Sequence, residues 1–171
     1  DVLTLGVTYY QIQRLVAEGH AEKTGPGLYR LTDVEATEME TIAMVASAIP
    51  HAIVCLLSAL RVHELGTQSP YEVWLAIDRK ARKPRRAPAA VHIVRFSEQM
   101  LTYGVVTQAI QGARVKITTP ARTVVDCFRY RNKIGLDVAM EALRDAVRSR
   151  KATVSEIDRA AEVCRIRTVI G

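Results

Sequence analysis

The chain has 171 residues, 49% of them hydrophobic and 25% charged, with a formal net charge of +6 and a pI near 9.5. This composition is typical of a globular protein and excludes disordered, collagen-like and disulfide-framework chains. No apolar run reaches the roughly 18 residues of a membrane span, and no basic-then-apolar leader opens the chain, so we expect a soluble, cytoplasmic protein with no membrane partner. The excess positive charge favours an anionic partner. Three widely spaced cysteines indicate reduced thiols rather than disulfides or a zinc site: Cys55, Cys127 and Cys164.

Residues 6–19, GVTYYQIQRLVAEG, predict a short amphipathic helix. Thr8 can cap its start, Gly19 suits the left-handed position after its end, and an apolar stripe runs through Ile12, Leu15 and Val16. The other faces carry hydrogen-bonding side chains, namely Tyr10, Gln11, Gln13 and Arg14.

The next segment, HAEKTGPGLYRLT, predicts a hairpin around Thr24-Gly25-Pro26-Gly27. Helix, glycine and hairpin in this order are typical of the recognition helix and wing of a winged helix. The same order also occurs in proteins that never touch nucleic acid. Tyrosine, glutamine and arginine on the helix favour the DNA-binding interpretation, because they can hydrogen-bond base edges and phosphates.

Thr32-Asp33 is expected to cap a linking helix from about Glu35 to Ile49, which Pro50 ends. Beyond residue 50 the sequence pattern predicts both helices and strands. We expect a helix ending near Leu65 with Gly66 as its stop, strands at 71–77, 91–96, 105–110 and 113–118, and a helix starting at Thr119-Pro120. Gly135 is expected to break that helical run. Two further helices are predicted at 136–149 and, from a capping box at 153–156, up to about residue 164.

The positive charge is concentrated in the second part of the chain. Residues 1–40 sum to −4, whereas residues 79–95 hold seven basic and no acidic side chains. Prolines at 84 and 88 prevent a helix here, so we expect an exposed, unpaired basic loop. A solvated surface and a phosphate-contact surface both remain open as interpretations of its six cations: Arg79, Lys80, Arg82, Lys83, Arg85 and Arg86.

The sequence contains few patterns that are typical of catalytic or metal-binding sites. His63-Glu64 resembles the opening of a zinc-protease helix, but Thr67 stands where the second histidine is needed. The other histidines, His20, His51 and His92, have no ligand spacing and are expected at a surface or interface. Asp78 and Lys80, with Glu64 and Glu72 upstream, leave a metal-dependent nuclease as an alternative. We otherwise expect no catalytic residue, metal or cofactor.

Two stretches of the sequence resemble the AbiEi family, the antitoxins and transcriptional repressors of type IV toxin–antitoxin and abortive-infection systems. GVTYYQIQRLVAEGHAEKTGPGLYRL looks like the recognition helix and wing. SALRVHELGTQSPYEVWLAI, followed by a basic stretch and KITTPARTVVDCFRYRNKIGLDVAMEALRDAV, is similar to the C-terminal domain of the family. Family members have further helices before the recognition helix, so the resemblance implies a truncated reader in this chain.

The resemblance implies an α+β protein with a partial winged helix-turn-helix at 1–33, a linking helix at 34–50 and a mixed α/β antitoxin domain at 51–171. It implies negative autoregulation through promoter repeats in double-stranded DNA, and opposition to a nucleotidyltransferase-like toxin without a stable toxin complex. A protein-interaction module that uses the basic loop is a further alternative. We expect base contacts from Thr8, Tyr9, Tyr10, Gln11, Gln13 and Arg14, and phosphate contacts from Lys23, Thr24 and Arg30.

Overall fold

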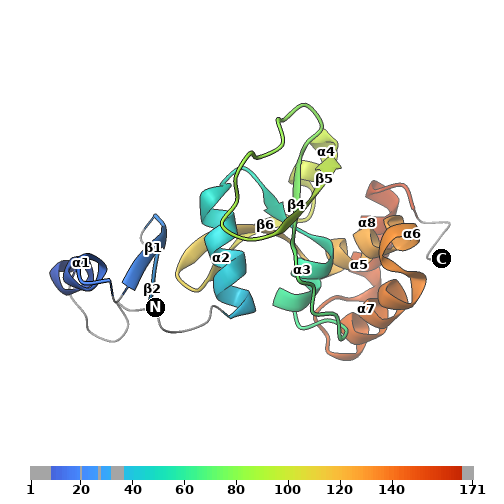
Figure 1. The fold of residues 1–171 in the computed structure, drawn as a ribbon. Helices are drawn as coiled ribbons and strands as arrows, with labels where there is room; N and C mark the ends of the chain where they lie inside the picture. Colours follow the sequence, from blue (N-terminus) through green and yellow to red (C-terminus); the bar gives the residue numbers. More distant parts are fainter. Residues whose placement is uncertain (1–8, 20, 27, 32–36, 167–171) are drawn as a thin grey trace.

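The computed structural model describes residues 9–19, 21–26, 28–31 and 37–166 (Figure 1). Its centre is a five-stranded mixed sheet with strand order β5-β4-β3-β7-β6. Strands β3 and β7 pair in parallel, as do β4 and β5, while β3–β4 and β6–β7 are antiparallel. The strands are β3 (Ile53–Val54), β4 (Val73–Asp78), β5 (Val91–Phe96), β6 (Val105–Ile110) and β7 (Ala113–Thr118). The expected mixed α and β architecture of this half is therefore confirmed.

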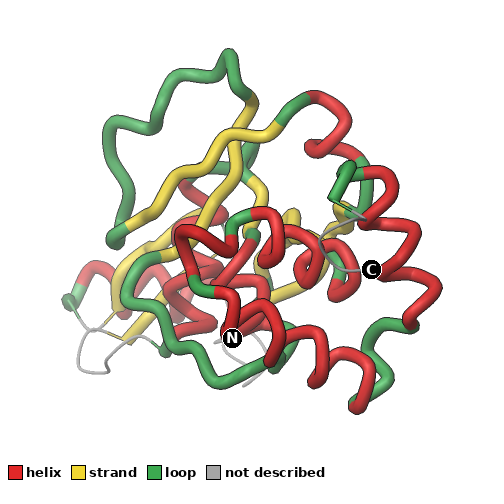
Figure 2. Tube along the Cα trace, turned by 90° about the vertical axis from the view of Figure 1, so that its right-hand side faces the viewer, coloured by secondary structure: helices red, strands yellow, loops and turns green. Residues whose placement is uncertain are grey.

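Helices cover both faces of the sheet, which is why β4 is an almost continuous apolar run. Val73, Leu75 and Ile77 of β4 pack on the face covered by α2 (Glu38–Ala48). Trp74 and Ala76 point to the other core, beneath α3 (Leu56–Val62) and α5 (Pro120–Arg129). Figure 2 shows the helices gathered on either side of the strands. Around α5 lie α4 (Glu98–Thr102), α6 (Arg131–Ile134), α7 (Leu136–Arg148) and α8 (Val154–Val163).

The helix boundaries in the second half follow local signals that the sequence shows. Thr119 caps α5 by accepting a hydrogen bond from the Arg122 amide, with Pro120 in the first turn. Gly135, at φ +101°, separates α6 from α7. Thr153 and Glu156 form the predicted capping box of α8. These predictions are confirmed because each depends on residues within one turn.

The N-terminal part contains α1 (Tyr9–Ala17) and an antiparallel hairpin of β1 (Ala21–Gly25) and β2 (Leu28–Leu31). Gly19, at φ +79°, ends the helical turn as expected. Helix and hairpin thus form at the predicted places, and β1 lies next to α2. Thr8, the expected cap, is outside the described residues, and the remainder of a winged helix is not shown.

The predicted cap of the linking helix is wrong. Helix α2 begins after Thr37, whose hydroxyl accepts from the Glu40 amide while the Glu40 carboxylate accepts from the Thr37 amide. This reciprocal pair satisfies two amides at once and sets the start of the helix at Thr37. Thr32, with Glu35 three residues later, shows the same pattern in the sequence but lies outside the described residues. The apolar residues of α2 are buried against the sheet: Ile42, Ala43, Val45 and Ala46.

No helix in the described ranges is both long and apolar enough to cross a membrane. The three cysteines are unpaired and buried, as expected of reduced core thiols.

Candidate nucleic-acid interface

Helix α1 turns a polar face to solvent. Ile12 is buried at 2% exposure, whereas Tyr10 is 78% exposed and Gln11 and Gln13 are also exposed. Arg14 donates to the Glu18 carboxylate at 2.8 Å, across an i, i+4 pair whose two side chains are largely in solvent. Such exposed pairs contribute only about 0.3–0.5 kcal/mol, so Arg14 can exchange this partner for a phosphate or a base edge.

The hairpin carries one exposed cation among its described side chains. Lys23 of β1 is exposed and lies opposite Tyr29 in the antiparallel register. The backbone of Glu22 pairs with that of Arg30. The side chains of Tyr9, Thr24 and Arg30, which we predicted at the DNA, lie outside those that the structure describes, as does Thr8.

The basic loop, residues 79–90, connects β4 to β5 and arches beyond the ends of the two strands (Figures 1 and 2). All six cations predicted there are exposed, which confirms that part of the prediction. No acidic residue occurs between 79 and 95, and within the described part of the chain none of the six forms an ion pair. The loop is therefore a cationic surface without internal neutralisation.

The carboxylates of the nuclease alternative do not converge. Asp78 Oδ1 accepts from the Lys80 backbone amide at 2.7 Å, which is a turn contact. Glu72 pairs with His92 at 3.2 Å, and Glu64 lies 3.7 Å from Lys151. Among the described residues no three His, Cys, Asp or Glu side chains are grouped to hold a metal ion.

Two histidines have structural contacts. His63 Nε2 lies 2.7 Å from the Thr118 carbonyl, and burial lowers the pKa of this imidazole. His92 stacks on Trp74 with ring centroids 3.9 Å apart, while its Nδ1 faces Glu72. His51 is exposed, and His20 is outside the described residues.

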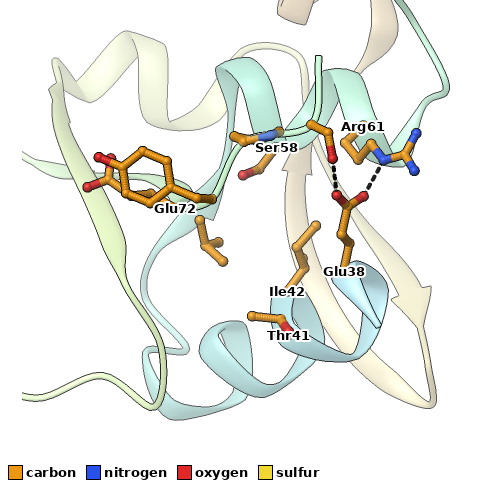
Figure 3. Close-up of a pocket in the computed structure, with 10 residues that line it drawn as sticks. Glu38, Thr41, Ile42, Ser58, Arg61 and Glu72 are labelled. Atoms are coloured by element: carbon orange, nitrogen blue, oxygen red, sulfur yellow. Dashed lines mark hydrogen bonds and ion pairs between the residues drawn. The ribbon is translucent and has the colours of Figure 1, made fainter. Parts of the chain in front are cut away.

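A pocket of about 310 Å³ opens between α2, α3 and the segment before β4 (Figure 3). The Glu38 carboxylate in its wall accepts hydrogen bonds from Arg61 and Ser69, and these bonds lower the pKa of Glu38. Glu72 on the opposite side is held by His92. The charged walls of this pocket are therefore already paired, and Glu72, named in the nuclease alternative, is the one lining residue that the sequence analysis singled out.

The structure buries an ion pair that we did not predict. Arg122 and Asp126 are both fully buried on α5, with Nε and Oδ1 2.9 Å apart. Arg122 Nη1 also donates to the carbonyls of Met100 at 2.8 Å and Tyr103 at 2.5 Å, and the guanidinium lies 4.8 Å from the Phe96 ring centroid. Burial raises the pKa of Asp126 to about 6, against the opposing effect of Arg122. This network fixes the end of α4 to α5 and is remote from the basic loop in sequence.

Neither a family model nor a curated protein sequence matches this chain.

Proposed function

We propose that this protein is a non-enzymatic, double-stranded-DNA-binding repressor of the AbiEi type that also acts as a type IV antitoxin, opposing a nucleotidyltransferase-like toxin without a stable toxin complex. The observation that carries the proposal is the polar, exposed face of α1 followed directly by a hairpin with exposed Lys23. The resemblance of both halves of the chain to the AbiEi family supports the regulatory and antitoxin roles.

The dimensions and chemistry of α1 suit the major groove. An α-helix with its side chains is about 10–12 Å across, and the major groove is about 12 Å wide, so a helix such as α1 can lie in it. Gln13 and Arg14 offer the amide and guanidinium groups that read adenine and guanine edges, and Tyr10 offers a hydroxyl to a phosphate or base. Lys23 of the hairpin is exposed and supports a role as a phosphate-contacting cation of the proposed wing.

The two halves of the chain differ in charge and are proposed to make different contacts with DNA. Residues 1–40 sum to −4 and so contribute little non-specific attraction to DNA. The basic loop provides the cations that the N-terminal part lacks. Base selection is then assigned to α1, and phosphate attraction to the basic loop.

The test is fluorescence anisotropy of the full-length protein with a duplex from upstream of its own gene. Arg14→Ala should weaken binding by about 1–3 kcal/mol, roughly 5- to 150-fold, and relax sequence preference. Arg148→Ala is the matched control, because Arg148 is also an exposed helical arginine paired with an acid on its own helix. Equal affinities of wild type and Arg14→Ala would assign α1 a structural role.

The biological roles need cellular readouts. A reporter behind the same promoter should be repressed by the wild type and not by Arg14→Ala. Growth during expression of the neighbouring toxin gene should be rescued by the wild type. Duplex DNA incubated with the protein and Mg²⁺ should remain intact; cleavage that Asp78→Asn abolishes would replace this proposal with the nuclease.

A further inference from the structure

The basic loop has a three-residue periodicity. Residues 79–87 read Arg-Lys-Ala, Arg-Lys-Pro and Arg-Arg-Ala, so two cations are followed each time by a small or cyclic residue. The burial follows the same period: every cation is exposed, and every third residue, Ala81, Pro84 and Ala87, is half-buried. A loop with no preferred packing would show no such alternation.

Two of the three third residues, Ala81 and Ala87, anchor the loop to the body of the protein. Ala81 and Ala87, and also Ala89 beyond the repeats, pack against the core on the α2 side of the sheet. The cations between them are directed into solvent in pairs. The chain path is thus held by its alanines while the charges remain available.

Arg95 of β5 secures the start of the loop. Its Nη1 lies 3.1 Å from the Asp78 carbonyl, 3.1 Å from the Arg79 carbonyl and 2.6 Å from the Ala81 carbonyl. The Ala81 amide donates to the Asp78 carbonyl at 3.0 Å, which closes the first turn. One side chain therefore binds three successive parts of the loop backbone across the β4–β5 pair.

The surface chemistry indicates the partner. A protein interface needs large apolar or aromatic anchors at its centre. Residues 79–90 contain none, only Arg, Lys, Ala and Pro. Phosphodiester recognition needs cations alone. A triplet spans at most about 10 Å when extended and carries two cations, whereas each DNA strand presents one phosphate for roughly every 3.4 Å of helix axis, so one triplet can reach more than one phosphate.

We propose that residues 79–87 form a pre-organised strip that binds the phosphodiester backbone of nucleic acid irrespective of sequence, and that Arg95 is its positioning residue. Because the backbone of the loop already follows a fixed path, binding does not have to order that backbone. This proposal extends the proposed function, and it rests on that function for the choice of nucleic acid as the partner. It requires no base reading by α1.

The test compares Arg95→Met with Arg82→Met in the full-length protein. Each change removes one charge from an exposed arginine, and Arg82 makes no hydrogen bond or ion pair among the described residues. Affinity for a random-sequence 25-base-pair duplex is measured over a range of salt concentrations. Arg82→Met should flatten the salt slope by about one unit, as one lost phosphate contact does. Arg95→Met should flatten it by about two units or more, because the neighbouring cations lose their positions.

A second readout reports the loop itself. Trypsin cleaves after arginine and lysine, so an anchored loop should resist it and a released loop should not. Arg95→Met should be cut within residues 79–86 at least tenfold faster than wild type or Arg82→Met, with the same urea midpoint by Trp74 fluorescence. If the midpoint of Arg95→Met falls, Arg95→Lys, which keeps the charge, is measured instead. Faster cleavage of Arg95→Lys than of wild type supports positioning, and unchanged cleavage contradicts it.

Equal slopes and equal cleavage of the two Met variants would overturn the positioning role of Arg95. If both variants keep the salt slope of the wild type, the proposal that residues 79–87 bind phosphates is wrong. Poly-glutamate that competes as well as DNA at equal charge would assign the loop to an acidic protein partner instead of phosphates. Promoter recognition plays no part in this assay, so its failure and the failure of the proposed function are distinguishable.

Discussion

Replacing Arg122 with Met should reduce the stability of the protein severely. The substitution leaves Asp126 as a fully buried carboxylate without its partner. Removing one member of a buried ion pair costs about 3–5 kcal/mol. The carbonyls of Met100 and Tyr103 also lose the Arg122 donor, and an unsatisfied buried acceptor costs about 1–3 kcal/mol. A domain of this size has a free energy of unfolding of about 5–15 kcal/mol. The free energy of unfolding of Arg122→Met should therefore be close to zero.

The double variant Arg122→Met, Asp126→Leu separates charge from packing. Apolar residues of similar volume can replace a buried pair at little cost. The second substitution should therefore restore about 2 kcal/mol or more of what the first removed, leaving the deficit of the two carbonyls. The single and double variants, with Asp126→Leu alone, complete a double-mutant cycle.

The assay is urea unfolding followed by the fluorescence of Trp74, which is the only tryptophan and is 8% exposed. Circular dichroism gives an independent thermal midpoint. A double variant as unstable as the sum of its single variants would refute the reasoning, because it would show that no uncompensated charge remains in the Arg122→Met core.

Two further predictions concern the same region. Gly104→Ala should lower the free energy of unfolding by more than about 2 kcal/mol, since left-handed strain at φ +64° is joined by a clash in which the new Cβ would lie 2.7 Å from Arg122 Cβ. Gly19→Ala is the control, because Gly19 has φ +79° but nothing within 4 Å of the added Cβ. It should lower the free energy of unfolding only by the roughly 1–2 kcal/mol of left-handed strain. Similar losses in urea unfolding would contradict the clash. Because the folded pKa of Asp126, about 6, is above its ordinary 3.8, the folded state binds the extra proton between these values. The stability of wild type relative to Asp126→Asn should therefore rise as the pH falls from about 6 to 4; a fall over this window would show the opposite shift.

Much of the secondary structure was predictable because its signals are local. The start of α5 at Pro120, the break at Gly135 and the capping box of α8 each depend on residues that lie within one turn. The basic loop was predicted as an exposed segment, since proline and charge exclude other structures there. The same locality explains the error at α2. Thr32 and Thr37 lie five residues apart and each has a glutamate three positions later, so the local pattern alone does not choose between them.

The candidate interface was predictable in part. The polar face of α1 follows from helical periodicity, and the described members of that face are exposed. The three-residue period at 79–87 was present in the sequence, but its meaning depends on which residues touch the core. Arg95 carried no signal, because its three carbonyl partners are brought to it by the parallel pairing of β4 and β5.

The sequence alone therefore determined most of the longer helices, the longer strands and the location of the positive charge, since these depend on neighbours along the chain. It did not indicate the short helices α4 and α6. Tertiary structure decided the strand order β5-β4-β3-β7-β6 and the burial of Arg122 with Asp126. An arginine and an aspartate four residues apart also occur commonly as an exposed ion pair on a helix surface, so their spacing does not indicate burial. Only the packing of α5 beneath α4 and beside Phe96 supplies the carbonyls and the ring that make burial of that charge tolerable.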